Sequence, residues 1–325
     1  MQKFDNDLKN IVIAFDIGGT NMRVGFVESS TIISRTSIPT IPENGIENAA
    51  ERLSEMALKN PLMSSSNIVG IGVSTAGPIN PKTGVYNHPP NLHGWHNKTM
   101  KPLFKKKIGL PVWIGHDATL AALAETRIGR HKGIKNLIYV TISTGVGGGI
   151  IADGEMVTGA TGGAGEVGHI LVRSDGINCN VDCTGCFEGN ASGPAIKKLA
   201  LSKIKEGRKT ILHKNKSEEI ESITPEAVIL ASIKGDKFSE EIIMTVIENI
   251  AQGLSSLLNI FEPEALVVGG GVMKGLKHRW GEIVKLVTST ALPRYRTGAP
   301  VYITEMGDDI GILGATQLVY KNLYG

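Results

Sequence analysis

The stretch "IVIAFDIGGTNMRVGFVE", residues 11–28, joins two apolar runs through a glycine-rich turn. Its first half is a short apolar run that ends at Asp16, which is typical of a buried strand. After the turn, "MRVGFVE" alternates in polarity as the second strand of a hairpin does. The stretch therefore predicts two paired strands with a carboxylate and a tight glycine loop at one end.

The residues of this turn have the chemistry of a phosphate-binding loop. Gly18 and Gly19 let backbone N–H groups approach phosphate oxygens, and Thr20 and Asn21 can add side-chain hydrogen bonds. Asp16, at the end of the strand, could hold Mg²⁺ through water. For this motif alone, an ordinary hairpin turn stabilised by Asp16 is an equally good explanation.

Two further glycine corners occur in the second half of the chain. In "STGVGGG", Thr144 and Gly145 offer a hydroxyl and a flexible amide, while "VVGGGV" ends a strand and begins a helix at Gly269, Gly270 and Gly271. The two hairpin loops lack the lysine of a P-loop, and each leads into a strand rather than the helix of a dinucleotide fingerprint. Together the three corners indicate a nucleotide that spans two domains.

The rest of the chain alternates strands and helices in both halves. Strands are predicted at 31–38, 68–74, 111–115, 136–143, 265–270 and 301–305, and helices at 46–58, 117–129, 187–205, 225–234, 239–261, 280–288 and from 312. The recurrence of strand, glycine turn and strand suggests a distant duplication into two α/β halves. We expect one domain of residues 1–118 plus a C-terminal helix at about 311–325, and a larger one of residues 119–310, because chain ends commonly meet.

Composition narrows the class of protein. The chain of 325 residues carries 34 Lys+Arg against 31 Asp+Glu, a balance that argues against a dedicated nucleic-acid binder. The Lys-rich segment at 101–107 is predicted to be a solvated helix face. No apolar run reaches the roughly 20 residues of a membrane span, and the N-terminal "MQKFDNDLKN" is unlike a signal peptide. We therefore expect a cytoplasmic protein with neither a nucleic-acid nor a membrane partner.

All three cysteines of the chain lie within eight positions, at Cys179, Cys183 and Cys186. Thiols stay reduced in the cytoplasm, so an odd, clustered set indicates a metal site rather than disulfides.

In the order of these motifs, the chain resembles the ROK family (repressors, open reading frames and sugar kinases) of the actin-like ATPase and hexokinase superfamily. The resemblance covers nearly the whole chain and rests on "DIGGTNMRVG", "STGVGGGIIADGEMVTGATGGAGEVGH", "CNVDCTGCFE" and "VVGGGV". It implies two actin-like (ribonuclease H-like) domains with a nucleotide and sugar cleft between them, and a homodimer or dimer of dimers. About ten residues precede the first strand, so we expect no DNA-binding domain of the kind that family repressors carry.

The resemblance also assigns candidate residues to the sugar and to the chemistry. Asp117 matches the family's catalytic base, although a helix N-cap is the reading that the local sequence alone favours. The candidate sugar-binding residues are Gly77, Asn91, His116, Asp117, Glu166, His169 and Glu188. His116 stands where the family usually has Asn, so it either reshapes the sugar pocket or turns away from it.

Family members hold a structural zinc ion with one histidine and three cysteines. His169, Cys179 and Cys186 keep that spacing, but Val181 occupies the usual place of the middle cysteine and Cys183 follows two positions later. The C-x₂-C spacing of Cys183 and Cys186 is itself common at zinc sites. We expect all three cysteines and His169 to bind zinc, which leaves the ion no open position and makes it structural.

These implications lead to one functional hypothesis and two alternatives. The leading hypothesis is an ATP- and Mg²⁺-dependent hexose kinase that phosphorylates the sugar 6-hydroxyl, with glucose as substrate. An N-acetylmannosamine or other N-acylhexosamine kinase is the alternative within the class. A non-catalytic sugar sensor on the same scaffold is the alternative from another class.

Overall fold

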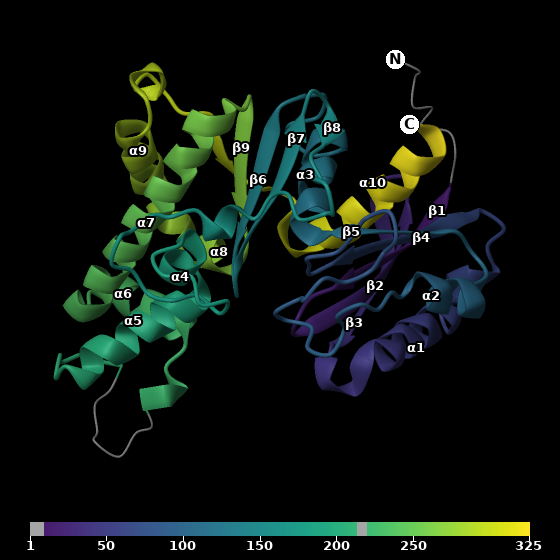
Figure 1. Cartoon of the computed structure of the whole chain (residues 1–325), viewed down its shortest axis with the longest axis horizontal. Coiled ribbons are helices and arrows are strands. Elements are labelled where there is room, and N and C mark those ends of the chain that lie inside the picture. The colour runs from purple at the N-terminus through teal and green to yellow at the C-terminus, as the bar shows by residue number, and fades with distance from the viewer. Residues whose placement is uncertain (1–9, 213–219) are drawn as a thin grey trace. The chain divides into compact units, whose positions relative to one another are not determined.

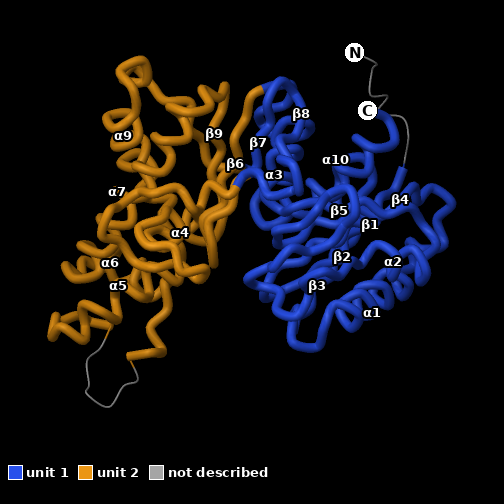
Figure 2. Tube along the Cα trace, in the orientation of Figure 1, with its two compact units in different colours: residues 1–135, 149–165, 305–325 blue, residues 136–148, 166–304 orange. Residues whose placement is uncertain are grey.

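The computed structural model describes residues 10–212 and 220–325 and forms two compact units (Figure 2). Unit 1 comprises residues 1–135, 149–165 and 305–325. Unit 2 comprises residues 136–148 and 166–304. We expected a domain boundary at 118/119, whereas contacts group the whole of α3 (Asp117–Arg127) with unit 1. The functional domain division stays a prediction.

The first sheet has the strand order β3-β2-β1-β4-β5. Its strands are β1 (Ile11–Ile17), β2 (Asn21–Glu28), β3 (Thr31–Pro39), β4 (Ile68–Thr75) and β5 (Val112–His116). β1 pairs antiparallel with β2, which confirms the predicted hairpin, and parallel with β4. The hairpin register sets Asp16 opposite Arg23, at the end of the sheet where the glycine loop lies.

Helices cover both faces of this sheet (Figure 1). They are α1 (Gly45–Leu58) and α2 (Lys101–Ile108) on one face, and α3 and α10 (Ile310–Tyr324) on the other. Side chains of β1 alternate between the two layers: Phe15 packs in the core with α1 and α2, and Ala14 packs against Ile312. The C-terminal helix thus returns to the first sheet, as the sequence led us to expect.

The second sheet has the order β10-β9-β6-β7-β8. Its strands are β6 (Leu137–Ile142), β7 (Val146–Ala152), β8 (Glu155–Met156), β9 (Ala265–Gly269) and β10 (Val301–Ile303). β9 is buried along its whole length and pairs parallel with both β6 and β10. Such burial on both faces explains its continuous apolar run.

Unit 2 contains the helices α4 (Phe187–Ala191), α5 (Gly193–Lys205), α6 (Pro225–Ile233), α7 (Lys237–Phe261), α8 (Gly271–Gly275) and α9 (Trp280–Thr290). Of these, α4, α5, α6 and α9 pack against the long helix α7, and α8 packs on β9. The prediction of one helix over 187–205 is wrong. The backbone is extended at Ser192, whose hydroxyl accepts a hydrogen bond from the Ala195 N–H and so caps a new helix, with Pro194 in its first turn.

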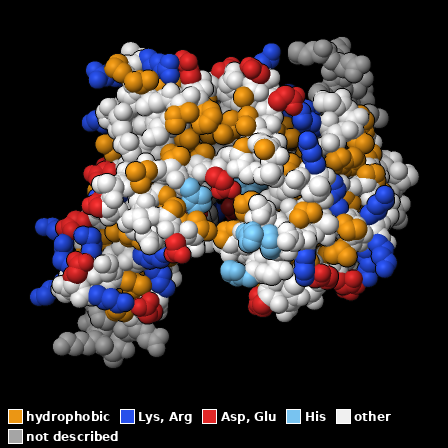
Figure 3. Space-filling model, viewed as in Figure 1, with side chains coloured by type: hydrophobic (Ala, Val, Ile, Leu, Met, Phe, Trp, Pro, Cys, Tyr) orange, Lys and Arg blue, Asp and Glu red, His pale blue; other side chains and the backbone are white. Residues whose placement is uncertain are grey.

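The surface of the described residues adds two observations. On the face that Figure 3 shows, Lys and Arg side chains lie in scattered groups. Among the helices within residues 10–212 and 220–325, none has the length and apolar character that a bilayer span requires.

Candidate functional site

The glycine loop between β1 and β2 is held tightly by backbone bonds. Gly18 N–H donates to the carbonyl oxygen of Asn21 (2.9 Å), and the Thr40 hydroxyl donates to the carbonyl oxygen of Gly18 (2.7 Å). The Thr40 N–H donates to the Thr20 carbonyl oxygen. Thr20 and Asn21 are exposed at the tip of the loop, while Gly19 is half-buried. The loop therefore presents a hydroxyl and an amide from a fixed backbone.

Asp16 lies half-buried beside this loop. Its Oδ2 accepts a hydrogen bond from Arg23 Nη1 (3.0 Å), and the same nitrogen donates to the carbonyl oxygen of Asp308 (2.9 Å). A Cβ at Gly311, in the first turn of α10, would overlap Asp16 Oδ1. Burial raises the pKa of Asp16 to about 6, with Arg23 opposing the shift and the charge of Asp117 adding to it. The carboxylate thus sits where a further cation would stabilise its ionised form.

Arg23 was not among the predicted site residues. The signal that could have found it is the hairpin register, because Arg23 lies directly opposite Asp16 in the pair of strands. Nothing in the spacing of a single sequence marks its second contact, to the Asp308 carbonyl, which comes from the far end of the chain.

Asp117 is the first residue of α3, immediately after β5. The N-cap position belongs to His116, which makes no side-chain cap bond, so the alternative reading of Asp117 as the N-cap residue is wrong. Asp117 Oδ1 accepts a hydrogen bond from the Ala118 N–H (2.6 Å) and lies 3.3 Å from His116 Nε2. A Cβ at Gly77 would stand 2.5 Å from His116 Cδ2, so the imidazole rests on the Gly77 backbone.

Asn91 reaches the glycine loop from the long connection between β4 and α2. A Cβ added at Gly19 would lie 3.0 Å from the Asn91 Cβ. In the same connection the rings of His88 and His96 stack with their centroids 3.4 Å apart. Unit 1 therefore contains two groups of neighbouring candidate residues. Asn91 lies beside the glycine loop, and His116 lies beside Gly77 and Asp117.

In unit 2, the loop after β6 contacts Glu188. Glu188 Oε2 accepts a hydrogen bond from the Val146 N–H (3.0 Å) and would stand 2.6 Å from a Cβ at Gly145. The Ser143 N–H donates to the Gly145 carbonyl oxygen (2.8 Å), which closes the turn beside Thr144. Glu188 is thus placed against the second predicted phosphate loop.

The third glycine corner packs directly on that loop. A Cβ at Gly270 would overlap the carbonyl oxygen of Ile142, and one at Gly271 would lie 3.4 Å from Ser143 Oγ. Gly270 has φ of +96°, a conformation that glycine adopts without strain. Gly269 ends β9, so the third corner begins at the end of that strand and contacts Ile142 and Ser143, which precede the second corner.

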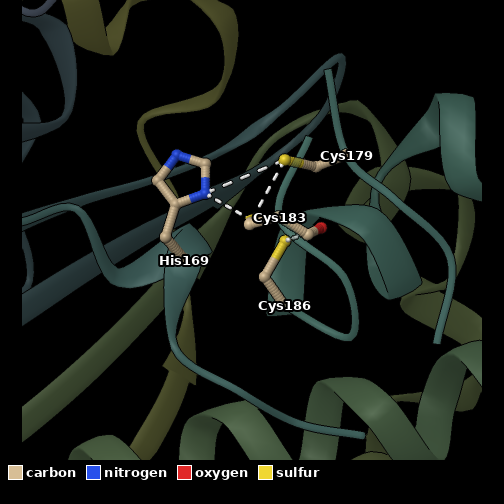
Figure 4. Close-up of side chains that lie close together, drawn as sticks. All are labelled: His169, Cys179, Cys183 and Cys186. Carbon is tan, nitrogen blue, oxygen red and sulfur yellow. Dashed lines mark hydrogen bonds between the residues drawn. The ribbon is translucent and has the colours of Figure 1, made fainter. Parts of the chain in front are cut away.

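Four candidate metal ligands converge on one point (Figure 4). His169 Nδ1 lies 3.3 Å from Cys183 Sγ and 4.0 Å from Cys179 Sγ, and the two sulfurs lie 3.1 Å apart. With Cys186, all four ligand atoms are within 4.8 Å of one another. Ligands at about 2.0–2.3 Å from one tetrahedral zinc ion would have spacings of this order. The group is compatible with zinc.

The three thiols of the cluster differ in acidity. Burial raises the pKa of Cys183 and Cys186, whereas at Cys179 burial is outweighed by hydrogen bonds, first of all the one with Cys183, and the pKa is lowered. A divalent cation displaces thiol protons on binding. The donor set of three thiols and one imidazole nitrogen therefore fits zinc in number and in kind.

The remaining contacts orient this cluster. His169 Nε2 faces away from the sulfurs and lies 3.9 Å from Glu166 Oε2. The buried Asn190 accepts a hydrogen bond from the Ile177 N–H (3.2 Å) and donates to the Cys186 carbonyl oxygen (2.8 Å), which ties the two ends of the cysteine loop together. Asn190 was not among the predicted residues, and no spacing signal in the chain marks it.

The predicted site residues divide between the two units. Unit 1 carries Asp16, Gly18, Gly19, Thr20, Asn21, Gly77, Asn91, His116 and Asp117, and unit 2 carries Thr144, Gly145, Glu166, His169, Cys179, Cys183, Cys186, Glu188, Gly269, Gly270 and Gly271. Each group is assembled within its own unit.

The chain is similar to known proteins along nearly its whole length. The family model of the ROK family matches residues 12–322. The chain is 33% identical to a glucokinase from Halalkalibacterium halodurans over 313 residues, 94% of each protein. It is similar to the crystal structure of a ROK hexokinase from Thermus thermophilus (27% identity, TM-score 0.79, 96% of this chain and 99% of that one). It is also similar to a ROK family glucokinase from Streptomyces griseus, solved with glucose and AMPPNP (27% identity, TM-score 0.74, 96% and 100%). The predicted α/β class with two actin-like domains is confirmed.

Proposed function

Because this chain belongs to the ROK family and is an ATP-dependent sugar kinase, we propose that it transfers the γ-phosphoryl group of ATP to the 6-hydroxyl of a hexose. Glucose is the substrate we propose, since the relatives that match over 94% or more of their length include glucokinases. An N-acylhexosamine such as N-acetylmannosamine is the alternative. The kinase relatives favour an enzyme over the non-catalytic sensor.

The observation that carries the proposal is the placement of Asp117. Its Oδ1 accepts the Ala118 N–H, which leaves Oδ2 to accept the proton of a sugar hydroxyl. Phosphoryl transfer needs such a carboxylate, an in-line hydroxyl and groups that stabilise charge on the phosphoryl oxygens. The Gly18 N–H is bonded within the turn, to the Asn21 carbonyl oxygen, so we propose that the Gly19 N–H and the Thr20 hydroxyl meet the phosphate oxygens.

Asp16 is the residue that we propose to hold Mg²⁺, through water. When bound, the ion would neutralise charge on the phosphates. Asp16 suits this role because it is half-buried and keeps only one close cationic partner among the described residues, Arg23. Arg23 in turn holds the carboxylate at the end of β1, next to the glycine loop.

We propose that zinc, held by His169, Cys179, Cys183 and Cys186, has a structural role. The metal would fix Nδ1 of His169, so that Nε2 points toward Glu166 and can donate to a sugar hydroxyl. Glu188 follows the last cysteine by two residues and is anchored by the Val146 N–H. The zinc loop would then form one wall of the sugar site with these three polar side chains.

Two further proposals concern the protein as a whole. We propose that it is cytoplasmic, and that it assembles as a homodimer or a dimer of dimers. Light scattering during size exclusion tests the second proposal, since a monomer over the whole concentration range would contradict it.

The test of function is a substrate panel with the purified protein, ATP and Mg²⁺. We expect ADP release with glucose and weaker release with N-acetylmannosamine. If none of the hexoses or hexosamines supports ADP release, the kinase proposal is contradicted. If ADP release is faster with N-acetylmannosamine than with glucose, only the proposed substrate changes.

Asp117→Ala tests the proposed base. We expect kcat to fall by about 10²–10⁴-fold, the contribution typical of a general base, while the dissociation constant for the sugar changes little. Steady-state kinetics and calorimetric titration with sugar measure the two quantities. Turnover close to that of the unaltered protein would remove Asp117 from this role.

A further inference from the structure

The His116 imidazole packs directly on the backbone of Gly77, at a distance that only glycine allows. β4 and β5 pair in parallel with Thr75 opposite His116, so the chain that continues from β4 passes beside the imidazole at Gly77. A Cβ at Gly77 would lie 2.5 Å from Cδ2 and 3.3 Å from Nε2 of that ring. Any larger residue at Gly77 would therefore push the ring away from its observed position.

In this position the imidazole ring lies close to the side chain of Asp117, the next residue of the chain. His116 Nε2 lies 3.3 Å from Asp117 Oδ1, the same oxygen that accepts the Ala118 N–H at 2.6 Å. Two nitrogens thus converge on one oxygen of a carboxylate that is otherwise partly exposed, with 40% of its side-chain surface accessible. The other oxygen, Oδ2, has no such neighbour in the described hydrogen bonds of Asp117.

We propose that His116 is a positioning residue for Asp117: the imidazole, seated on Gly77, holds Oδ1 so that Oδ2 faces the reacting hydroxyl. This inference rests on the proposed function, in which Asp117 is the base. In the observed geometry Nε2 lies 3.3 Å from Oδ1 without a hydrogen bond; a neutral imidazole with its proton on Nε2 would donate to that oxygen once the two groups align, and would leave the carboxylate ionised. His116 thus acts on the carboxylate and does not itself bind sugar.

The reason that such a contact matters is geometric. A carboxylate at the first position of a helix can rotate about two side-chain bonds, and a displacement of about 1 Å from productive geometry can cost up to about 10²-fold in rate. The Ala118 N–H alone fixes one point of the carboxylate. A second contact on the same oxygen restricts the rotation that remains. Contacts of this kind are often long before substrate binds and shorten in the complex.

Three variants test the proposal by kcat, by KM and by sugar affinity measured calorimetrically. We expect His116→Ala to lower kcat by about 10-fold or more with sugar affinity within about twofold of the unaltered protein. His116→Gln, whose side-chain amide can donate to the same oxygen, is expected to recover most of kcat. Gly77→Ala, which displaces the ring, is expected to lower kcat as His116→Ala does.

The double variant Gly77→Ala/His116→Ala separates positioning from packing. If Gly77 acts by seating the imidazole, the two losses are not additive and the double variant resembles His116→Ala. Additive losses, a Gln variant as slow as the Ala variant, or a loss of sugar affinity at unchanged kcat would each overturn the proposal.

The Asp117→Ala variant keeps this test distinct from the test of function. Inactive Asp117→Ala with a fully active His116→Ala would overturn only the role of His116. Active Asp117→Ala would contradict the proposed base itself, whatever the His116 variants do.

Discussion

Cys183 departs from the expected spacing of the cysteines, yet it lies among the four candidate metal ligands. Val181, in the place of the usual cysteine, is half exposed, and only its N–H contacts the cluster, at Cys179 Sγ (3.3 Å). Asp182 and Gly185 have φ of +60° and +73°, so left-handed backbone conformations lie on both sides of Cys183. With this backbone, Cys183 Sγ lies 3.3 Å from His169 Nδ1.

Cys183→Ser tests this ligand directly. Because a structural zinc site contributes folding free energy outright, the loss of one thiolate should lower both zinc content and thermal stability. We expect fewer than one zinc ion per chain by metal analysis after dialysis against a mild chelator, and a melting temperature several degrees below that of the unaltered protein. A strong chelator should lower the melting temperature of the unaltered protein to a similar value.

Val181→Ala is the matched control, since this exposed side chain lies on the same loop and its backbone N–H is retained. It should keep full zinc content and unchanged melting. Full zinc content and unchanged melting in Cys183→Ser would remove Cys183 from the ligand set.

At the scale of elements, most strands and helices could be predicted from the sequence. The hairpin of β1 and β2 could be predicted because polarity and glycine placement both mark it, and buried β9 because its apolar run is bounded by a turn. The break at Ser192 could not, because apolar spacing continues through it and the break depends on a hydroxyl cap. Where a helix ends depends on the capping bonds of a few residues, and the spacing of apolar residues does not reveal those bonds.

The site shows the same division between local and distant information. Asp16 could be marked as a candidate because it ends a strand beside a glycine loop, and Asp117 because it matches the catalytic base of the family that the chain resembles. The seat of His116 on Gly77 could not, since it depends on the parallel register of β4 and β5. Asn190 was missed for a similar reason: its partners at Ile177 and Cys186 are fixed only when the cysteine loop closes.

Gly72→Ala tests the packing of two elements, β4 and α10. A Cβ at Gly72 would overlap the carbonyl oxygen of Ala315, and backbone cannot move aside as a flexible side chain can. Overpacking of this kind costs about 1–3 kcal/mol, and we expect the free energy of unfolding to fall by at least about 2 kcal/mol. Urea denaturation measures the change.

Gly281→Ala provides the comparison for this prediction. Gly281 lies in α9 with open space where its Cβ would be, so alanine there should be neutral or stabilising by up to about 1 kcal/mol. Equal effects of the two substitutions would show that α10 does not pack on β4 as closely as described.

At the scale of the whole molecule, both halves repeat one device, a glycine corner at the end of a buried strand with a carboxylate beside it. In unit 1 the pair is the loop at Gly18 and Asp16, and in unit 2 it is the loop at Gly145 and Glu188. The chain also closes on itself within unit 1, where Tyr320 Oη donates to the Asn10 carbonyl oxygen. Function is therefore expected to depend on both units, and stability on contacts between distant parts of the sequence.

His131, in the connection between α3 and β6, is expected to make the stability of the molecule depend on pH. Burial lowers the pKa of this histidine, the charge of Arg130 lowers it further, and Glu305 opposes them. The unfolded chain then binds a proton more readily than the folded chain does, so the stabilisation is complete above the unfolded pKa of about 6.5 and is lost as pH falls below it. One proton contributes at most about 1.4 kcal/mol per pH unit.

The urea concentration at the midpoint of unfolding, measured between pH 7.5 and pH 5.5, gives this dependence. Substitutions of His131 and of the two charged residues near it test its cause. His131→Asn should flatten the slope of stability against pH because the buried titrating group is gone. Glu305→Gln removes the opposing charge, so the pKa of His131 falls further and stability is lost over a wider pH range. Arg130→Gln removes a charge that lowers the pKa of His131, so the pKa should rise and stability should be lost over a narrower pH range. Identical slopes in the unaltered protein and in His131→Asn would assign the acid sensitivity of the fold to other groups.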